Sequence, residues 1–164
     1  MATSNSPRSP ALQSLWDFAL AFYAQPQVAE ICVQLQDHHR VNVCLLIGLR
    51  WLDDAEKYVS DDDLKDLHAH TQHWAQAVVV PLRSLRRLLK QPLANYAQDE
   101  MQEQVRAAVK QAELLAEKKL LLEIEGWLKR APLTQNTCIA PNLERYLLSL
   151  GVSKDAIELL KQKF

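Results

Sequence analysis

Residues 43–52, VCLLIGLRWL, are the most apolar stretch of the chain, and they decide the fold. Arg50 is the only charged residue among them, and a helix that is apolar on nearly all sides lies in the interior of a domain. Asn42 directly precedes the stretch, where a side-chain oxygen caps the first turn of a helix. The stretch therefore predicts a central helix, which we expect to pack against the first, second and fourth helices.

Gly48 lies inside this apolar stretch. Glycine costs a helix about 1 kcal/mol relative to alanine, so its presence indicates that a neighbouring helix packs closely there. The chain has only two other glycines, Gly126 and Gly151, and no two of the three are close together. A phosphate-cradling loop needs clustered glycines, so the sequence excludes P-loop and Rossmann chemistry.

On the N-terminal side, residues 12–24 (LQSLWDFALAFYA) are apolar almost all round and predict a helix buried on most sides. Pro26 suits the first turn of a second helix, because the missing N–H costs nothing there. Asp17 and Arg50 each interrupt an apolar helix, and buried charges are tolerated mainly when paired. We predict that Asp17 pairs with Arg50, or that Arg50 pairs with Asp37.

On the C-terminal side, a fourth helix begins at residues 60–74 (SDDDLKDLHAHTQHW) and runs to about Val80, where Pro81 ends or kinks it. Residues 82–90 continue as a helical turn or two. Residues 95–129 predict one long helix, as the arm of an antiparallel hairpin, with apolar residues at three-four spacing: Met101, Val105, Ala108, Ala112 and Leu115. Two short helices close the chain, one stopped by Gly151 and one capped by Ser153.

These patterns predict an all-α protein: a single-domain bundle of six or seven helices, with one long helix near residues 95–129 and no strand. Residues 1–11 read as a flexible tail, because MATSNSPRSP lacks the apolar core of a signal peptide. Residues 12–164 form the domain, and its part from 93 onwards holds the long helix and the two short ones.

The composition argues against several classes of function. The 164 residues carry a net charge of −1, with 48% hydrophobic and 24% charged residues, as in an ordinary soluble globule. A nearly neutral chain has no overall attraction to nucleic acid, and no apolar run approaches the roughly 20 residues that span a bilayer. Three cysteines form no CxxC pair and are expected to be buried thiols in a reducing cytosol: Cys32, Cys44 and Cys138.

The acidic start of the fourth helix resembles a metal site. Asp62, Asp63 and Asp66 match DDxxD, the arrangement that holds magnesium and a diphosphate in prenyl-diphosphate enzymes, and His70 and His73 are one turn apart. The competing interpretation is that the aspartates stabilise the positive N-terminal end of a helix, each by roughly 0.3–1 kcal/mol. We favour that interpretation, because no second acidic motif is present on a facing helix and HExxH spacing is absent. We therefore expect no metal and no cofactor.

A basic face follows some twenty residues later. Arg83, Arg86, Arg87 and Lys90 share one side of a helix, at a spacing that can bind phosphates or an acidic partner. The same charges also complement the negative end of a helix dipole without any ligand. This face is therefore the candidate binding site.

Two stretches carry a family resemblance. SLWDFALAFYAQPQVAEICVQLQDHHRVNVCLLIGLRWL and HWAQAVVVPLRSLRRLLK resemble a family of uncharacterised proteobacterial proteins of about this length. The family pattern, LWxFxLxxYxxPxV, then DVNLLLxxxW, then PLRxxRRxLK, covers about residues 14–90, so residues 12–92 form a family-like core. This chain departs from the DVN element, which reads Asn42-Val43-Cys44 here. The resemblance implies a bacterial, cytoplasmic helical domain and no established activity.

Two functions follow as hypotheses. The first is a non-enzymatic, cytoplasmic interaction or regulatory protein that meets a protein partner through the 83–90 face or the long helix. The alternative is an enzyme or sensor for a metal or phosphorylated ligand, with the Asp/His helix start on one side and the arginines on the other. Contact of the arginines with RNA is a third hypothesis, and it predicts strongly salt-dependent binding.

Overall fold

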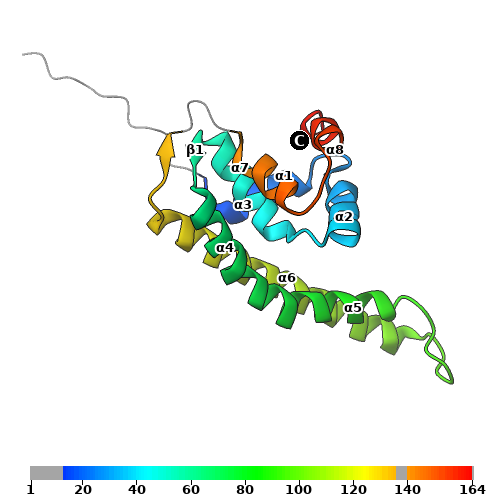
Figure 1. The fold of residues 1–164 in the computed structure, drawn as a ribbon. Coiled ribbons are helices and arrows are strands. Elements are labelled where there is room, and N and C mark those ends of the chain that lie inside the picture. Colours follow the sequence, from blue (N-terminus) through cyan, green and yellow to red (C-terminus); the bar gives the residue numbers. More distant parts are fainter. Residues whose placement is uncertain (1–12, 136–139, 164) are drawn as a thin grey trace, which may run out of the picture.

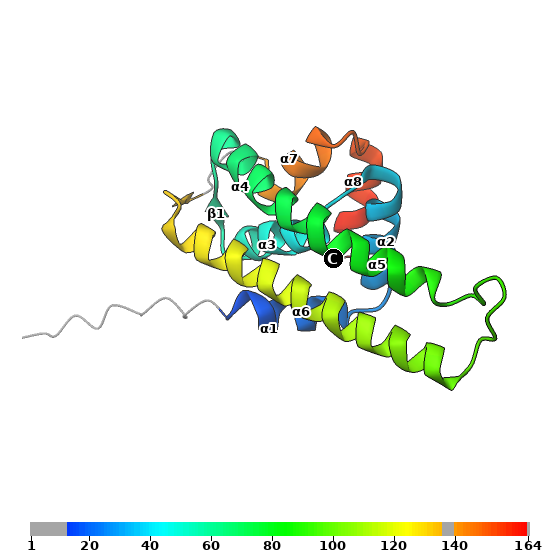
Figure 2. The same ribbon diagram turned by 90° about the horizontal axis from the view of Figure 1, so that it is seen from below.

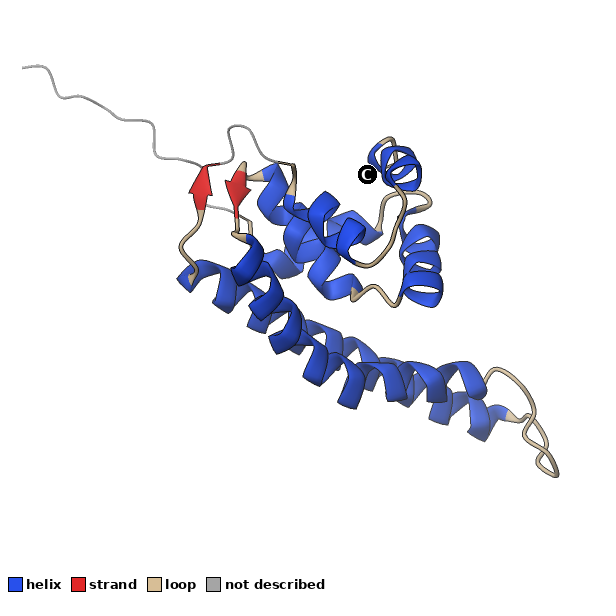
Figure 3. Cartoon of the chain, viewed as in Figure 1, coloured by secondary structure: helices blue, strands red, loops and turns tan. Residues whose placement is uncertain are grey.

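Helices account for nearly all of the regular structure in the computed structural model, which describes residues 13–135 and 140–163 (Figures 1 and 3). The all-α prediction is confirmed. The elements follow in the order α1 (Leu15–Tyr23), α2 (Val28–His39), α3 (Val43–Asp54), β1 (Lys57–Tyr58), α4 (Asp61–Trp74), η1 (Ala75–Val79), α5 (Val80–Leu88), α6 (Glu100–Arg130), β2 (Thr134–Gln135), α7 (Asn142–Ser149) and α8 (Lys154–Lys161).

A small antiparallel sheet departs from the predicted absence of strands. Lys57 of β1 pairs with Gln135 of β2, and Tyr58 pairs with Thr134. Strands of two residues are too short to show an alternating apolar pattern, so the sequence does not reveal them. The pair joins the end of α3 to the end of the long helix α6.

The central helix α3 is the core, as the sequence predicts. Every residue of 43–52 is buried except Arg50, and the Asn42 carboxamide oxygen accepts the Leu45 N–H at 3.3 Å. The main neighbours of α3 are α1, α6 and α7, rather than the second and fourth helices that we expected beside the first. The reason is that α6 returns along the body and lies across α3 (Figure 2).

The close approach predicted at Gly48 is confirmed. A Cβ placed on Gly48 would lie 2.7 Å from Ile124 Cγ2 of α6, closer than carbon atoms pack in proteins. Leu15 Cδ2 of α1 lies 3.7 Å from the same point. Gly48 therefore lets α3 and α6 approach without a side chain between them.

Replacement of Gly48 by alanine is expected to lower the free energy of unfolding by about 1 kcal/mol. The overpacking penalty of about 1–3 kcal/mol exceeds the gain in helix propensity of about 1 kcal/mol. Adding Ile124→Leu, which removes the Cγ2 methyl and conserves volume, should recover most of the loss. Urea unfolding of the two single variants and the double variant measures this coupling. Additive effects, or a gain of stability for Gly48→Ala alone, would contradict the explanation.

Of the two alternatives predicted at Pro81, an end of the helix is wrong, because the helical run α4–η1–α5 continues through Pro81 with a local irregularity just before it. The Val80 N–H bonds to the Ala75 carbonyl five residues earlier, which makes η1 a π-helical turn. Proline lacks an N–H and clashes with the carbonyl four residues earlier, and the wider turn accommodates both effects. The run lies antiparallel to α6, so the predicted hairpin is present (Figure 2).

The long helix begins at Glu100, five residues later than predicted. Asp99 caps it by accepting the Gln102 N–H at 2.9 Å, and Asn95 has a left-handed backbone (φ 68°) outside the helix. The predicted apolar stripe does not face the core: Met101 and Leu115 are 63% and 67% exposed. Apolar residues occur on several sides of α6, so spacing alone did not identify its buried face.

Two predictions for the N-terminal helices are wrong. The α1 residues Leu20 and Tyr23 are exposed, so the helix is buried on one side only. Pro26 lies in the turn before α2, which begins at Val28.

The predicted ion pairs of Asp17 and Arg50 are wrong. Asp17 is exposed and accepts the Ser14 hydroxyl at 2.7 Å. The Arg50 Nε atom bonds to Asp54 Oδ1 at 2.8 Å, one turn along the same helix. Asp37 pairs with Arg87 instead. Asp17 and Arg50 each find a partner within one turn, and Asp37 finds one on a neighbouring helix, so none of these charges has to cross the core.

The C-terminal helices follow the predicted signals. Gly151 ends α7 with a left-handed backbone (φ 79°), and Ser153 Oγ accepts the Ala156 N–H at the start of α8. The predicted tail at residues 1–11 and the thiol of Cys138 lie outside the described residues.

Candidate functional site

The basic face predicted at residues 83–90 is divided between two roles. Arg83 and Arg86 turn toward α6 and pair with its acidic residues. The Arg83 Nε atom lies 3.0 Å from Glu113 Oε1 and its Nη2 atom 2.5 Å from Glu117 Oε1, while Arg86 Nε donates to Glu113 Oε2. These two arginines therefore join the two helices of the hairpin.

The ion-pair network of Arg83 and Arg86 with Glu113 and Glu117 is largely buried, which indicates that it stabilises the fold. The side chains of Glu113 and Arg83 are only 7% and 14% exposed. The hydrogen bond to Glu113 raises the pKa of Arg86, and burial raises the pKa of Glu117 although Arg83 opposes the shift. Charges held this way are not free to receive a partner, because removing one member leaves the others buried and uncompensated.

The rest of the basic face is exposed. The Arg87 Nη1 atom lies 3.1 Å from Asp37 Oδ1 of α2, and both side chains are 42% exposed. Lys90 is exposed and has no ion pair with any described residue. Exposed pairs of this kind contribute only about 0–1 kcal/mol, so Arg87 can exchange Asp37 for another anion at little cost.

The Asp/His stretch begins α4, and Ser60 caps its first turn. The Asp63 N–H donates to Ser60 Oγ at 3.1 Å, and Asp62 lies 3.4 Å from Lys65. Asp66, His70 and His73 are exposed. Among the described residues, no three potential ligands of the His, Cys, Asp or Glu type come together as a metal site.

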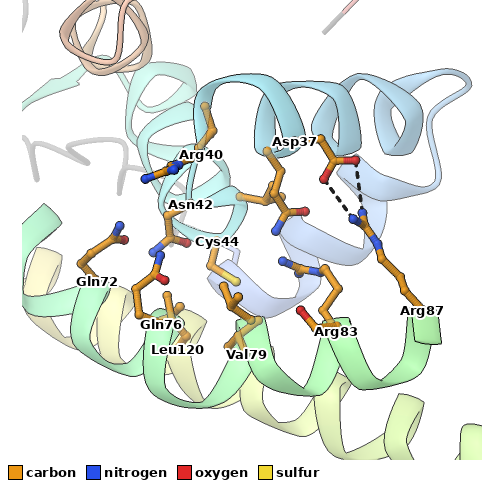
Figure 4. A pocket seen from close by; sticks show the side chains of 16 residues that line it. Asp37, Arg40, Asn42, Cys44, Gln72, Gln76, Val79, Arg83, Arg87 and Leu120 are labelled. Carbon is orange, nitrogen blue, oxygen red and sulfur yellow. Dashed lines mark hydrogen bonds and ion pairs between the residues drawn. The ribbon is translucent and has the colours of Figure 1, made fainter. Parts of the chain in front are cut away.

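A polar cleft of about 510 Å³ lies between the α2–α3 corner and the α4–η1–α5 run (Figure 4). Three arginines and one aspartate reach it, together with the side-chain amides of Gln36, Asn42, Gln72 and Gln76. The charged residues at the cleft are Asp37, Arg40, Arg83 and Arg87.

An apolar groove of about 420 Å³ lies on the other side of Arg83, between α1 and the arm. We call α5, residues 89–99 and residues 100–117 of α6 the arm. The groove has apolar walls and a charged edge, at which Arg83, Arg86, Arg87 and Lys110 meet Glu113 and Glu117. Its apolar residues are Trp16, Ala19, Leu20, Tyr23, Val33, Val43, Ile47, Leu114 and Leu121.

Two buried thiols are present among the described residues, and one of them, Cys44, lines both cavities. Burial raises the pKa of Cys32 to about 11 and also raises that of Cys44. Because the thiolate is the reactive form, both side chains stay protonated and unreactive at neutral pH. The Cys44 thiol instead donates to the Glu117 carbonyl at 3.9 Å.

Sequence reasoning missed several residues that line the cavities. Arg40, Lys110, Leu20 and Tyr23 were not singled out as site residues. The cavity residues that the sequence did identify are the arginines of the predicted basic face and the helix cap Asn42. No local signal marks the others, because they come together only when α1, α2 and the arm meet.

The fold and cavities define a class: a helical protein with an extended hairpin arm and two clefts where the arm meets the body. A family model described as a protein of unknown function (DUF2390) matches residues 14–124, so the chain belongs to that family. Every residue lining the two clefts lies inside the matched segment, which extends beyond residue 90, where our resemblance ended. No curated protein and no solved structure matches the chain. None of the described helices is long and apolar enough to cross a membrane.

Proposed function

We propose that the protein is a cytoplasmic, non-enzymatic interaction protein that holds an acidic amphipathic helix of a partner in the apolar groove. The observation that carries this proposal is the combination of an exposed apolar wall with a cationic edge. The thiols of Cys32 and Cys44 are protonated and unreactive, which agrees with a protein that performs no nucleophilic chemistry. Free thiols also agree with a reducing compartment.

The wall of the groove exposes more apolar surface than scattered single residues would. Leu20 and Tyr23 of α1 are 52% and 41% exposed. Val33 of α2 and Leu114 of α6 are 44% exposed each, so three helices contribute to the wall. Grooves of this kind receive the apolar face of a partner helix, whose anchor residues are spaced by three and four. Contiguous exposed apolar surface also marks interaction sites.

The charged edge argues for an acidic partner. Four cationic side chains and two acidic ones line the groove, which leaves an excess of positive charge. Lys110 makes no ion pair with any described residue, and Arg87 makes only an exposed one. Cations beside an apolar wall attract a helix with apolar residues on one face and carboxylates along its edge.

The alternative function, a metal-dependent enzyme or sensor, has less support. It needs the Asp/His helix start to act together with the arginines. Asp62, Asp63 and Asp66 instead lie on an exposed helix start, and Arg83 and Arg86 are occupied by Glu113 and Glu117.

A pair of model peptides tests the proposal. Both are helices of about five turns with the same leucine face, and one carries glutamate and the other lysine on its polar face. The glutamate peptide is expected to bind, as measured by fluorescence anisotropy, and the lysine peptide to bind at least about tenfold more weakly. Lys110→Glu should weaken binding of the glutamate peptide and leave the fold intact, because Lys110 is exposed and unpaired.

Cross-linking locates the contact. A photo-reactive residue at Leu20 or Leu114 should capture the glutamate peptide, and the same residue at Leu159 of α8, which is 64% exposed and outside the groove, should not. Equal binding of the two peptides, equal capture at Leu159, or binding of a single-stranded RNA in place of either peptide would overturn the proposal.

A further inference from the structure

The polar cleft contains a buried hydrogen-bond donor that has no acceptor. Asn42 is 8% exposed, and its Nδ2 atom has no hydrogen-bond partner among the described residues. Its Oδ1 atom accepts the Leu45 N–H at the start of α3. If the Asn42 carboxamide were rotated by 180°, its NH₂ group would face the Leu45 N–H, and two donors would meet. The cap therefore fixes the orientation of the carboxamide, with Nδ2 as the free donor.

The start of α3 adds further donors at the same place. The Asn42 carbonyl accepts the Leu46 N–H and the carboxamide accepts the Leu45 N–H, which leaves the N–H groups of Val43 and Cys44 without an intrahelical acceptor. Both residues line the cleft. The N-terminal end of a 12-residue helix therefore faces the cavity, and such ends attract anions.

Two arginines supply the available charge, and both are labelled in Figure 4. Arg40 has no ion-pair partner among the described residues, whereas Arg83, also at the cleft, is already paired with Glu113 and Glu117. Arg87 holds Asp37 in an exposed pair that another anion can replace. A guanidinium fork fits the oxygens of phosphate and carboxylate groups.

Arg40 occupies a backbone position that favours glycine. Its φ is 55°, and its N–H closes α2 by bonding to the Gln36 carbonyl at 3.0 Å. Glycine adopts this left-handed conformation without strain, whereas arginine does not. The folded protein therefore holds an arginine at the mouth of the cleft against its backbone preference.

From these observations we infer that the polar cleft binds a small oxyanion, a metabolite that carries a phosphate or carboxylate group. The anionic oxygens bond to Asn42 Nδ2 and the first N–H groups of α3, and Arg40 and Arg87 neutralise the charge. The cavity of about 510 Å³ is within the size range of small-molecule sites, and its side-chain amides can bond to the rest of the ligand.

The first experiment uses inorganic phosphate, pyrophosphate and citrate as probes, each compared with chloride at the same ionic strength. Amide NMR shifts are expected to change at Val43 and Cys44 and in the Asn42 side-chain NH₂ signal. Stronger binding of pyrophosphate would identify a phosphorylated ligand, and stronger binding of citrate a carboxylate. No localised shift with any of the three at roughly 10 mM, where even a weak site is occupied, would overturn the inference.

Two variants separate binding from folding. Asn42→Asp keeps the helix cap but replaces the NH₂ donor by a carboxylate, so anion binding should fall by at least about tenfold while the unfolding temperature changes little. Arg40→Gly should weaken binding and raise the unfolding temperature, because it relieves the positive φ. Lys90→Gln, which removes an exposed cation outside the cleft, is the control and should bind as the unaltered protein does.

The outcome is independent of the partner-helix proposal. Arg40 and Asn42 line the polar cleft alone, while Leu20 and Lys110 line the apolar groove alone. Unchanged anion binding in Asn42→Asp would overturn the oxyanion site and leave the groove untouched. Loss of peptide binding in Lys110→Glu has no bearing on the cleft.

Discussion

Glu113→Gln is expected to lower the free energy of unfolding by about 3 kcal/mol or more. Glu113 is 7% exposed and receives hydrogen bonds from both Arg83 and Arg86. Removing one member of a buried ion-pair network costs about 3–5 kcal/mol, because the remaining charges keep the cost of burial and lose their compensation. The same change should loosen the arm, since these bonds join α5 to α6.

Urea unfolding measures the loss, and hydrogen exchange of the α5 and α6 amides localises it. Asp37→Asn is the matched control, because it removes the carboxylate of the Arg87 pair, in which both side chains are 42% exposed. Its expected cost is about 0–1 kcal/mol. A loss below about 1 kcal/mol for Glu113→Gln would show that Arg83 and Arg86 are available to a ligand after all.

Asn142→Asp is expected to cost about 4 kcal/mol at neutral pH, because it places a carboxylate against two partly buried acceptors. The Asn142 Nδ2 atom donates to Asp53 Oδ1 and to the Lys57 carbonyl, each at 2.7 Å. Its Oδ1 atom accepts the Val59 N–H at 3.0 Å and Arg145 Nη2 at 2.8 Å, and the variant keeps these two bonds. Asn142 is fully buried, so solvent cannot replace either donated bond.

The loss in free energy of unfolding caused by Asn142→Asp should depend on pH. Burial raises the pKa of Asp53, although the N–H groups of Leu143 and Asn142 oppose the shift. Because the repulsion requires both carboxylates to be ionised, the loss relative to the unaltered protein should shrink as the pH falls toward about 4. Thermal unfolding across this range measures the effect, with Asp54→Asn, an exposed partner of Arg50, as the control. A deficit that does not change with pH would contradict the charge repulsion.

Together these two predictions separate structural charges from available ones. The arginines that stand out in the sequence, Arg83 and Arg86, hold the hairpin together. The cations left for a ligand at the two cavities are Arg40, Arg87 and Lys110, which are exposed and either unpaired or only weakly paired among the described residues. The charge that we propose for ligand binding thus comes from the end of α2, from α5 and from α6 rather than from one helix face.

Three predictions based on neighbouring residues agree with the structure. The cap at Asn42, the close approach at Gly48 and the helix stop at Gly151 each follow from one residue and a few neighbours. Such signals are local because a cap bonds within its own first turn and a glycine marks its own backbone.

Predictions of which side chains pair across large separations in the chain were wrong or absent. Asp17 and Arg50 were paired across the core, whereas each bonds within its own helix. The partners of Arg83 and Asn142 lie 30 and 89 positions away in the chain, at Glu113 and Asp53, and nothing near either residue points to them.

The sequence by itself determined that this protein is a helical bundle around residues 43–52, because apolar spacing and caps act within a few turns of one helix. Only the tertiary structure decided which charges are neutralised and which line a cavity. That depends on where α6 crosses α3 and how α5 lies against it, and many segments have apolar faces that would permit other crossings. The two clefts exist because the arm meets the body at α1, α2 and the start of α3, a contact between segments far apart in the chain.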